Sequence, residues 1–142
     1  MATTPDVVRE RIASICASAP FGFTQAVTPF DFSKQPAGQI DQVFRVTQDA
    51  DRVIGGLNYT EDRTDVVEIW LARKQSAAAN AAYTQLLADA AALRSAVIRD
   101  GSTGGGDYAV PDEGHGMRIQ HDPGFEYAVL RVSLAVNYEV QH

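Results

Sequence analysis

Cysteine and positive charge are both scarce in this sequence of 142 residues. The one cysteine, Cys16, cannot form a disulfide within the chain, and it excludes zinc and iron–sulfur sites that need several cysteines. We expect it to be a small core residue on the apolar side of a helix. The 12 Lys and Arg residues are outnumbered by 18 Asp and Glu residues, which gives a net charge of −6. This balance opposes non-specific attraction to nucleic acid or to an anionic membrane.

Long apolar runs are also lacking. No stretch approaches the length that a membrane-spanning helix requires. The chain starts with MATTPDVVRERI, which carries charged side chains and no apolar segment typical of a signal peptide. The sequence therefore predicts a soluble protein that is made and used in a cytoplasm and has no membrane partner.

The sequence contains no recognisable catalytic or metal-binding motif. There is no GxSxG or HExxH pattern, and His115 and His121 stand six positions apart, which fits no common metal-ligand spacing. The glycine-rich run GSTGGGD follows a predicted helix and lacks the Lys-Ser/Thr ending of a phosphate-binding loop. Adjacent carboxylates such as Glu61 and Asp62 do not provide an acid and a base in different environments. We therefore predict no catalytic residue, no bound metal and no cofactor, and a protein that is not an enzyme.

The clearest pattern that is present lies in FEYAVLRVSLAVNYEV, at 125–140. Side chains alternate between the two faces of a strand, so one face here carries Leu130, Val132, Leu134, Val136, Tyr138 and Val140. The other face is mixed, which indicates an antiparallel sheet with one face on the core. At about 3.3 Å per residue the strand would span about 50 Å, more than the diameter of about 37 Å expected for the domain. It must bend near Ala128, or one end must extend beyond the domain and meet another chain.

Two helices follow from the apolar periodicity. Thr4 as N-cap and Pro5 as the first helical residue begin a helix that ends before Pro20. An Ala-rich helix is predicted at 76–99, where Asp100 and Gly101 end it. Its apolar stripe is predicted to consist of Ala79, Tyr83, Leu86, Leu87, Ala90, Leu93, Val97 and Ile98.

Strands and loops fill the rest of the chain. Strands are predicted at 40–48, 52–59, 65–74 and 117–121, with an aromatic-rich ordered loop at 20–38, turns at 49–51 and 122–124, a polar tip at 60–65, and a flexible loop at 101–116. Strands in runs with few helices are typical of an α+β fold. We expect a single domain over 1–142, in which an antiparallel or mixed sheet carries the N-terminal helix and the long Ala-rich helix on one face.

Three of these features together resemble one protein family. They are the capped N-terminal amphipathic helix, the strands around the polar tip TEDRTD, and the Ala-rich helix that leads through a loop to RVSLAVNYEV. This arrangement, which covers most of the chain, is similar to that of the tail terminator (tail completion) proteins of long-tailed bacteriophages and phage-derived particles. The resemblance implies an α+β structural virion protein without catalytic residues or a cofactor. It implies a hexameric ring that caps the tail tube, ends its polymerisation and docks to the head–neck connector.

The resemblance also implies partners and contact residues. The partners are other copies of the chain, the tail tube protein and the head–neck connector protein, while DNA passes through the ring without specific binding. The contacts are assigned to a partner-contact loop of Glu61, Asp62 and Arg63, and to a subunit-interface or lumen set of Arg131, Asn137 and Glu139. The expected location is the tail or neck of the virion, after assembly in the host cytoplasm.

Two other interpretations stay open at this point. Another neck protein of the same particle, such as a head-closure factor, would differ in stoichiometry and in the end of the tail that it binds. A small α+β ligand-binding protein or enzyme would use a pocket between helix and sheet, with the loop at 101–116 as a lid. A ligand at 100 times its Kd would then stabilise the fold by about 2.7 kcal/mol.

Overall fold

The computed structural model of the protein describes residues 4–26, 41–55, 60–74, 81–103, 108–110, 116–121 and 127–141. Within these ranges the elements follow in the order α1 (Pro5–Ala17), β1 (Thr24–Gln25), β2 (Val43–Gly55), β3 (Thr60–Lys74), α2 (Ala81–Thr103), β4 (Gly116–His121) and β5 (Tyr127–Gln141). The strands form one sheet in the order β1-β2-β3-β5-β4. β1 runs parallel to β2, and the other neighbouring strands are antiparallel.

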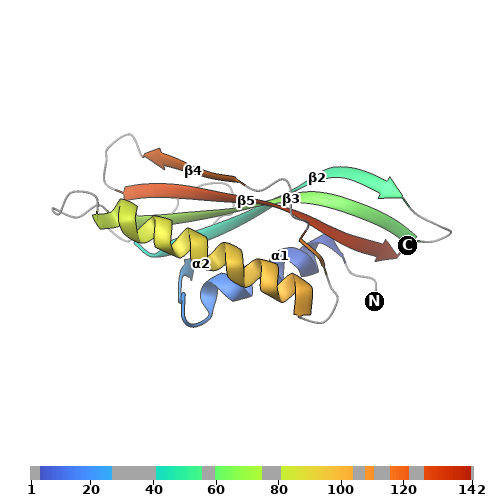
Figure 1. Ribbon diagram of the computed structural model, residues 1–142, viewed down its shortest axis with the longest axis horizontal. Helices are drawn as coiled ribbons and strands as arrows, with labels where there is room; N and C mark the ends of the chain where they lie inside the picture. Colours follow the sequence, from blue (N-terminus) through green and yellow to red (C-terminus); the bar gives the residue numbers. More distant parts are fainter. Residues whose placement is uncertain are drawn as a thin grey trace.

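Both helices lie against the same face of the sheet, as Figure 1 shows. This arrangement confirms the predicted α+β fold, in which a mixed sheet carries the N-terminal helix and the Ala-rich helix on one face. The short strand β1 was not expected from the sequence. It forms where the chain turns back after α1, with Phe23 buried and Ala26 donating its backbone N–H to Phe44 O at 2.8 Å.

The core is built on the central pair β3 and β5, which are antiparallel along their whole length. Val67, Ile69 and Leu71 of β3 are fully buried and lie opposite apolar residues of β5. The predicted apolar face of β5 is confirmed, because Leu130, Val132, Leu134 and Val136 are fully buried and Tyr138 and Val140 nearly so. Each such aliphatic side chain contributes about 1.5–3 kcal/mol when it is removed from water.

Helix α1 covers part of this apolar face with one stripe of side chains. Val8, Ile12 and Cys16 are completely buried. Burial raises the pKa of the Cys16 thiol to about 12, so the thiol is protonated at neutral pH. The helix ends at Ala17, before Pro20 as predicted. Thr4 is the N-cap, but its side chain does not cap the backbone; it bonds instead to Asp6, and this bond lowers the pKa of the Asp6 carboxyl.

Helix α2 differs from its prediction at its end and on its exposed side. It continues through Asp100 and Gly101 to Thr103, while residues 76–80 lie outside the described ranges. Tyr108 packs so closely that a Cβ at position 101 would lie 3.1 Å from its ring, so the glycine makes room for the ring. Two residues of the predicted stripe, Tyr83 and Leu87, are 44% and 36% exposed. The buried stripe consists of Ala82, Leu86, Asp89, Ala90, Leu93 and Val97.

The predicted turn at 49–51 and the predicted polar tip at 60–65 are both wrong. β2 is one strand from Val43 to Gly55, with a register shift between Ala50 and Arg52. Residues 60–65 belong to β3, where Thr60 lies opposite Gln141 and Asp62 lies opposite both Gly55 and Glu139. A bulge inserts a residue without ending a strand. Polar residues that are typical of turns are therefore accommodated inside a long hairpin.

The predicted loop at 101–116 contains more regular structure than expected. Its first residues belong to α2, its last residue begins β4, and Ala109 forms a bridge with Asn137 on the edge of β5. Tyr108 is buried beside this bridge. The strand predicted at 117–121 is confirmed as β4. The turn at 122–124 and most of the aromatic-rich loop, including Phe30 and Phe32, lie outside the described residues.

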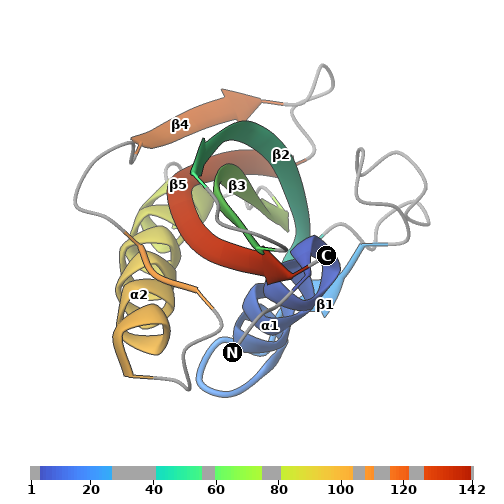
Figure 2. The ribbon, with the colours of Figure 1, turned by 90° about the vertical axis from the view of Figure 1, so that its right-hand side faces the viewer.

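The long strands extend beyond the two helices at one end of the molecule. In Figure 1 the ends of β2, β3 and β5 nearest the C-terminus project past both α1 and α2. Figure 2, viewed from that end, shows that β2 and β5 also follow a pronounced arc around β3. Long antiparallel strands normally twist. The C-terminal end of β5 therefore lies beyond the helices while it still pairs with β3, and its contact with another chain stays a prediction.

One ion pair connects the two helices. Arg11 donates from Nε to Asp100 Oδ2 at 2.7 Å and from Nη2 to Oδ1 at 3.1 Å, and the Tyr108 hydroxyl donates to the same Oδ2 at 2.7 Å. The bonds from Arg11, and then that from Tyr108, hold the pKa of the Asp100 carboxyl below its ordinary value of 3.8. A carboxyl with a lowered pKa in the folded state stabilises the fold above that ordinary value, and the contribution is lost as the pH falls through the folded-state pKa.

We predict that Asp100→Asn lowers the free energy of unfolding at pH 7 by up to about 1 kcal/mol, the range of partly exposed ion pairs. The difference between the variant and the wild type should shrink as the pH falls from 5 towards 3, because the wild-type carboxyl becomes protonated. Urea unfolding at a series of pH values measures this, with the exposed Glu10→Gln as control. A difference that stays constant down to pH 3 would contradict the assigned role of the ion pair.

Candidate functional site

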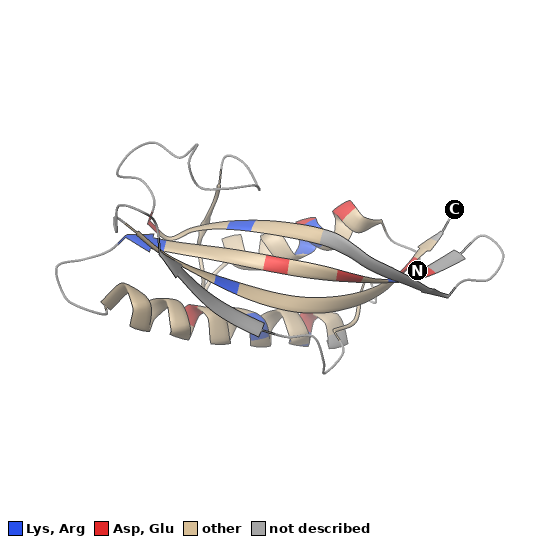
Figure 3. Ribbon diagram, turned by 90° about the horizontal axis from the view of Figure 1, so that it is seen from above, with Lys and Arg blue, Asp and Glu red and all other residues tan. Residues whose placement is uncertain are grey.

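The face of the sheet opposite the helices carries most of the charged groups of the central strands. We call it the helix-free face, because neither α1 nor α2 covers it, and Figure 3 shows it with its acidic and basic residues. Strand alternation and register place on it Val43, Arg45 and Thr47 of β2, Asp62, Thr64, Val66, Glu68, Trp70, Ala72 and Lys74 of β3, and Tyr127, Val129, Arg131, Ser133, Ala135, Asn137 and Glu139 of β5. Among them, Val43, Ala72 and Val129 form a small buried apolar cluster.

One row of the helix-free face is a stack of two guanidinium groups and an indole. Arg45, Trp70 and Arg131 are direct neighbours across β2, β3 and β5. The Cζ atom of Arg45 lies 4.1 Å from the centre of the Trp70 ring, and that of Arg131 lies 5.7 Å from it. Arg131 also donates from Nη1 to Glu68 Oε2 at 3.3 Å. Cations over an indole face are attracted by its quadrupole, so these three residues, the Arg–Trp patch, form one unit.

The Arg–Trp patch contains polar hydrogens without acceptors. Within the described part of the chain, the indole Nε1–H of Trp70 and the Nε–H of Arg131 are shielded from water and have no hydrogen-bond acceptor. A buried donor that is left unsatisfied costs about 1–3 kcal/mol. Such groups are rare in native proteins and call for an explanation.

The opposite end of the same face carries an acidic pair. Asp62 of β3 and Glu139 of β5 are direct cross-strand neighbours, and both are exposed. Like charges in such positions destabilise a sheet. Beside them, the Thr64 hydroxyl donates to Asn137 Oδ1 at 2.8 Å. The three residues predicted to form a subunit interface or lumen therefore do share one face, with Arg131 in the stack, Asn137 bonded to Thr64, and Glu139 in the acidic pair.

The predicted partner-contact loop is not a loop. Glu61, Asp62 and Arg63 lie in β3, where β5 pairs with all three and β2 pairs with Asp62 and Arg63. Asp62 is exposed on the helix-free face, whereas Arg63 lies on the other face. The guanidinium group of Arg63 approaches Asp65 Oδ1 at 3.5 Å and lies over the ring of Tyr138. Asp62 and Arg63 therefore lie on opposite faces of β3, and the contact of Glu61, Asp62 and Arg63 with a partner stays a prediction.

A buried polar cluster lies on the core face of the sheet, next to the apolar residues of β3 and β5. Asp65 is 1% exposed, accepts a hydrogen bond from the Tyr138 hydroxyl, and accepts another from Gln48 Nε2 at 2.8 Å. Burial, and then the bond to Asp65, raise the pKa of the Tyr138 phenol, so it stays a neutral donor. Sequence reasoning missed this cluster. Asp65 stands in phase with Val67 and Ile69, which is the signal that places it on the core face.

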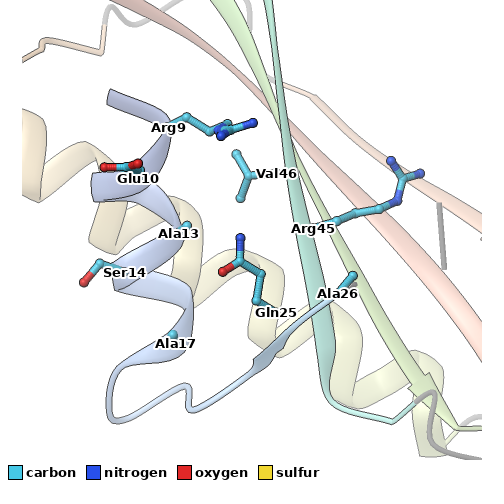
Figure 4. A pocket seen from close by; sticks show the side chains of 9 residues that line it. All are labelled: Arg9, Glu10, Ala13, Ser14, Ala17, Gln25, Ala26, Arg45 and Val46. Carbon is cyan, nitrogen blue, oxygen red and sulfur yellow. The ribbon is translucent and has the colours of Figure 1, made fainter. Parts of the chain in front are cut away.

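The described surface also contains a pocket of about 410 Å³ between α1, β1 and β2. Figure 4 shows its lining, which consists of Arg9, Glu10, Ala13, Ser14, Ala17, Gln25, Ala26, Arg45 and Val46. In that view Arg9 and Gln25 point toward β2, whereas Glu10 and Ser14 point away and Arg45 extends away from α1. The polar groups therefore diverge instead of converging on one ligand position.

Other candidate chemistry is limited in the part of the chain that the structure describes. There, no three or more His, Cys, Asp or Glu side chains are grouped to hold a metal ion. None of the described helices combines the length and apolar character needed to cross a membrane. His115 and most of the glycine-rich run lie outside the described residues. In comparisons with known proteins, no family model matches the chain, and no curated protein matches it at a significant level.

We predict that Tyr138→Phe lowers the free energy of unfolding by about 1–3 kcal/mol, because it leaves the buried Asp65 with one hydrogen-bond donor fewer. Tyr83→Phe is the matched control, since Tyr83 is 44% exposed. Thermal or urea unfolding measures both changes. Equal stability of the two variants would show that the bond from Tyr138 to Asp65 contributes nothing to the fold.

Proposed function

We propose that the protein is a tail terminator of a long-tailed bacteriophage or a phage-derived particle. Copies of the chain form a ring, expected to be hexameric, that caps the tail tube, ends its polymerisation and docks to the head–neck connector. The proposal joins the resemblance of the sequence to this family with an α+β fold that has two helices on one side of a long sheet.

The observation that carries the proposal is the helix-free face. It has a cationic, aromatic patch at one end and an acidic pair at the other, so a single chain presents two different and complementary surfaces. A closed ring requires such a heterologous interface, repeated by rotation. The projecting end of the sheet adds a surface that the helices do not cover.

The described buried charges support a structural role. Asp65 is held by Tyr138 and Gln48, and Asp89 accepts from Arg73 Nε at 2.6 Å. These carboxylates are bonded to groups of the same fold, as expected where charges fix the packing of elements. A net charge of −6 also suits a ring through which DNA slides without specific binding. The place of action is then the tail or neck of the virion, after assembly in the host cytoplasm.

A head-closure or other neck protein is the alternative within the same particle. It would assemble through the same kind of heterologous surface, so the fold does not distinguish a terminator from a head-closure protein. The two proteins differ in the end of the particle to which they bind. A terminator binds the free end of the tail tube, whereas a head-closure factor binds the head side of the connector.

We predict that light scattering over a concentration series finds a species of about six times the 15.3 kDa mass of one chain. Negative-stain images of that species should show rings with a central hole. Added to tail tubes of the cognate particle, the protein should sediment with them and stop their elongation. A chain that remains monomeric at every concentration and does not bind the tubes would contradict the proposal.

A further inference from the structure

We infer that neighbouring copies make contact head to tail on the helix-free face: the acidic pair Asp62 and Glu139 of one copy binds the Arg–Trp patch of the next. This inference rests on the proposed function, because it names the surfaces through which the ring closes. The occupant of the patch is thus a second copy of the same chain.

The first argument is geometric. Trp70 and Asp62 lie on β3, and Arg131 and Glu139 lie on β5, with the same spacing of eight positions in each strand. At about 3.3 Å per residue, the two charged rows are about 26 Å apart. They cannot meet within one copy, and each copy offers one of each. When the patch of one copy takes the acidic row of a second copy and its own acidic row binds a third, the contact repeats as a heterologous interface; a two-fold pair that uses both rows at once would stop at a dimer and would contradict the inference.

The two rows also carry complementary charges. The opposed carboxylates of Asp62 and Glu139 repel each other in the single chain, and cations placed between them relieve the repulsion. The patch carries two guanidinium groups, and the Arg131 side chain is 29% exposed although it is bonded to Glu68, so part of it faces solvent. Carboxylates are the acceptors that guanidinium groups bind most strongly, often with two parallel bonds.

The third argument concerns the surface between the two rows. Thr64, Val66 and Glu68 of β3 and Ser133, Ala135 and Asn137 of β5 separate the acidic pair from the patch, and Thr64 and Ala135 are buried. The longer side chains among them are bonded to neighbours, Glu68 to Arg131 and Asn137 to Thr64. The projecting end of a neighbouring sheet can therefore approach this face closely, and Glu68 is already directed to Arg131.

Two charge-reversal variants, assembled first singly and then as a mixture, test this contact. Glu139→Lys places a cation in the acidic row, and Arg131→Glu places an acid in the patch. Either variant alone should need at least a tenfold higher concentration for half-assembly, because each of its contacts then joins like charges. In a 1:1 mixture every contact again joins opposite charges, in an alternating ring with an even number of subunits. Assembly should return to within about threefold of the wild-type concentration.

Matched controls separate this contact from general effects of charge. Arg9→Glu and Glu10→Lys make the same changes on the exposed side of α1, on the other side of the sheet, and should assemble like the wild type. Circular dichroism and thermal unfolding check that each variant is folded. Because Arg131→Glu faces Glu68, Arg131→Gln is a second variant that removes the cation without adding an acid, and it should also weaken assembly.

The outcomes distinguish the inference from the proposed function. Wild-type rings together with folded reversal variants that assemble as well as the controls would overturn the inference and leave the function standing. Folded variants that do not assemble alone and do not assemble in the 1:1 mixture would overturn the pairing of these two rows. A wild type that forms no ring, either in solution or on tail tubes, would overturn the proposed function and the inference with it.

Discussion

The structure depends on the pairing of β3 with β2 on one side and β5 on the other. Every residue of β3, from Thr60 to Lys74, has a partner on β5, so the central strand is fixed along its whole length. The larger apolar cluster lies on one face, and both helices pack on that face. The helix-free face has a smaller buried cluster of Val43, Ala72 and Val129, and the rest of its described surface carries most of the charged groups of the central strands.

The difference in length between sheet and helices has a chemical consequence on each face. On the helical side, the apolar rows give way to Asp65, Arg63 and Tyr138 near the projecting end, where hydrogen bonds replace side-chain packing. On the helix-free side, the same end carries Asp62 and Glu139. Strand alternation continues unchanged, and only the chemistry of the side chains changes.

Periodicity predicted those elements in which the pattern of apolar residues directly reflects burial. The faces of β5 and of the second half of β3 follow from strand alternation, and the stripe of α1 with Val8 and Ile12 follows from helical spacing. Local rules failed in two places. Helix α2 continues through Gly101, against which Tyr108 packs, and the polar residues at 60–65 stay in a strand because β5 pairs with all of them and β2 with those from Asp62 onward. The cross-strand stack of Arg45, Trp70 and Arg131 also requires the register, which no single stretch of sequence contains.

A reconstruction of the assembled wild-type protein by electron cryomicroscopy tests the central claim most directly, because it shows which faces neighbouring subunits bury. The account predicts a closed ring in which the helix-free face of each subunit is covered by the next, with Glu139 of one copy beside Arg131 of its neighbour. A ring in which that face is open to solvent and the subunits meet through α1 or α2 would contradict it.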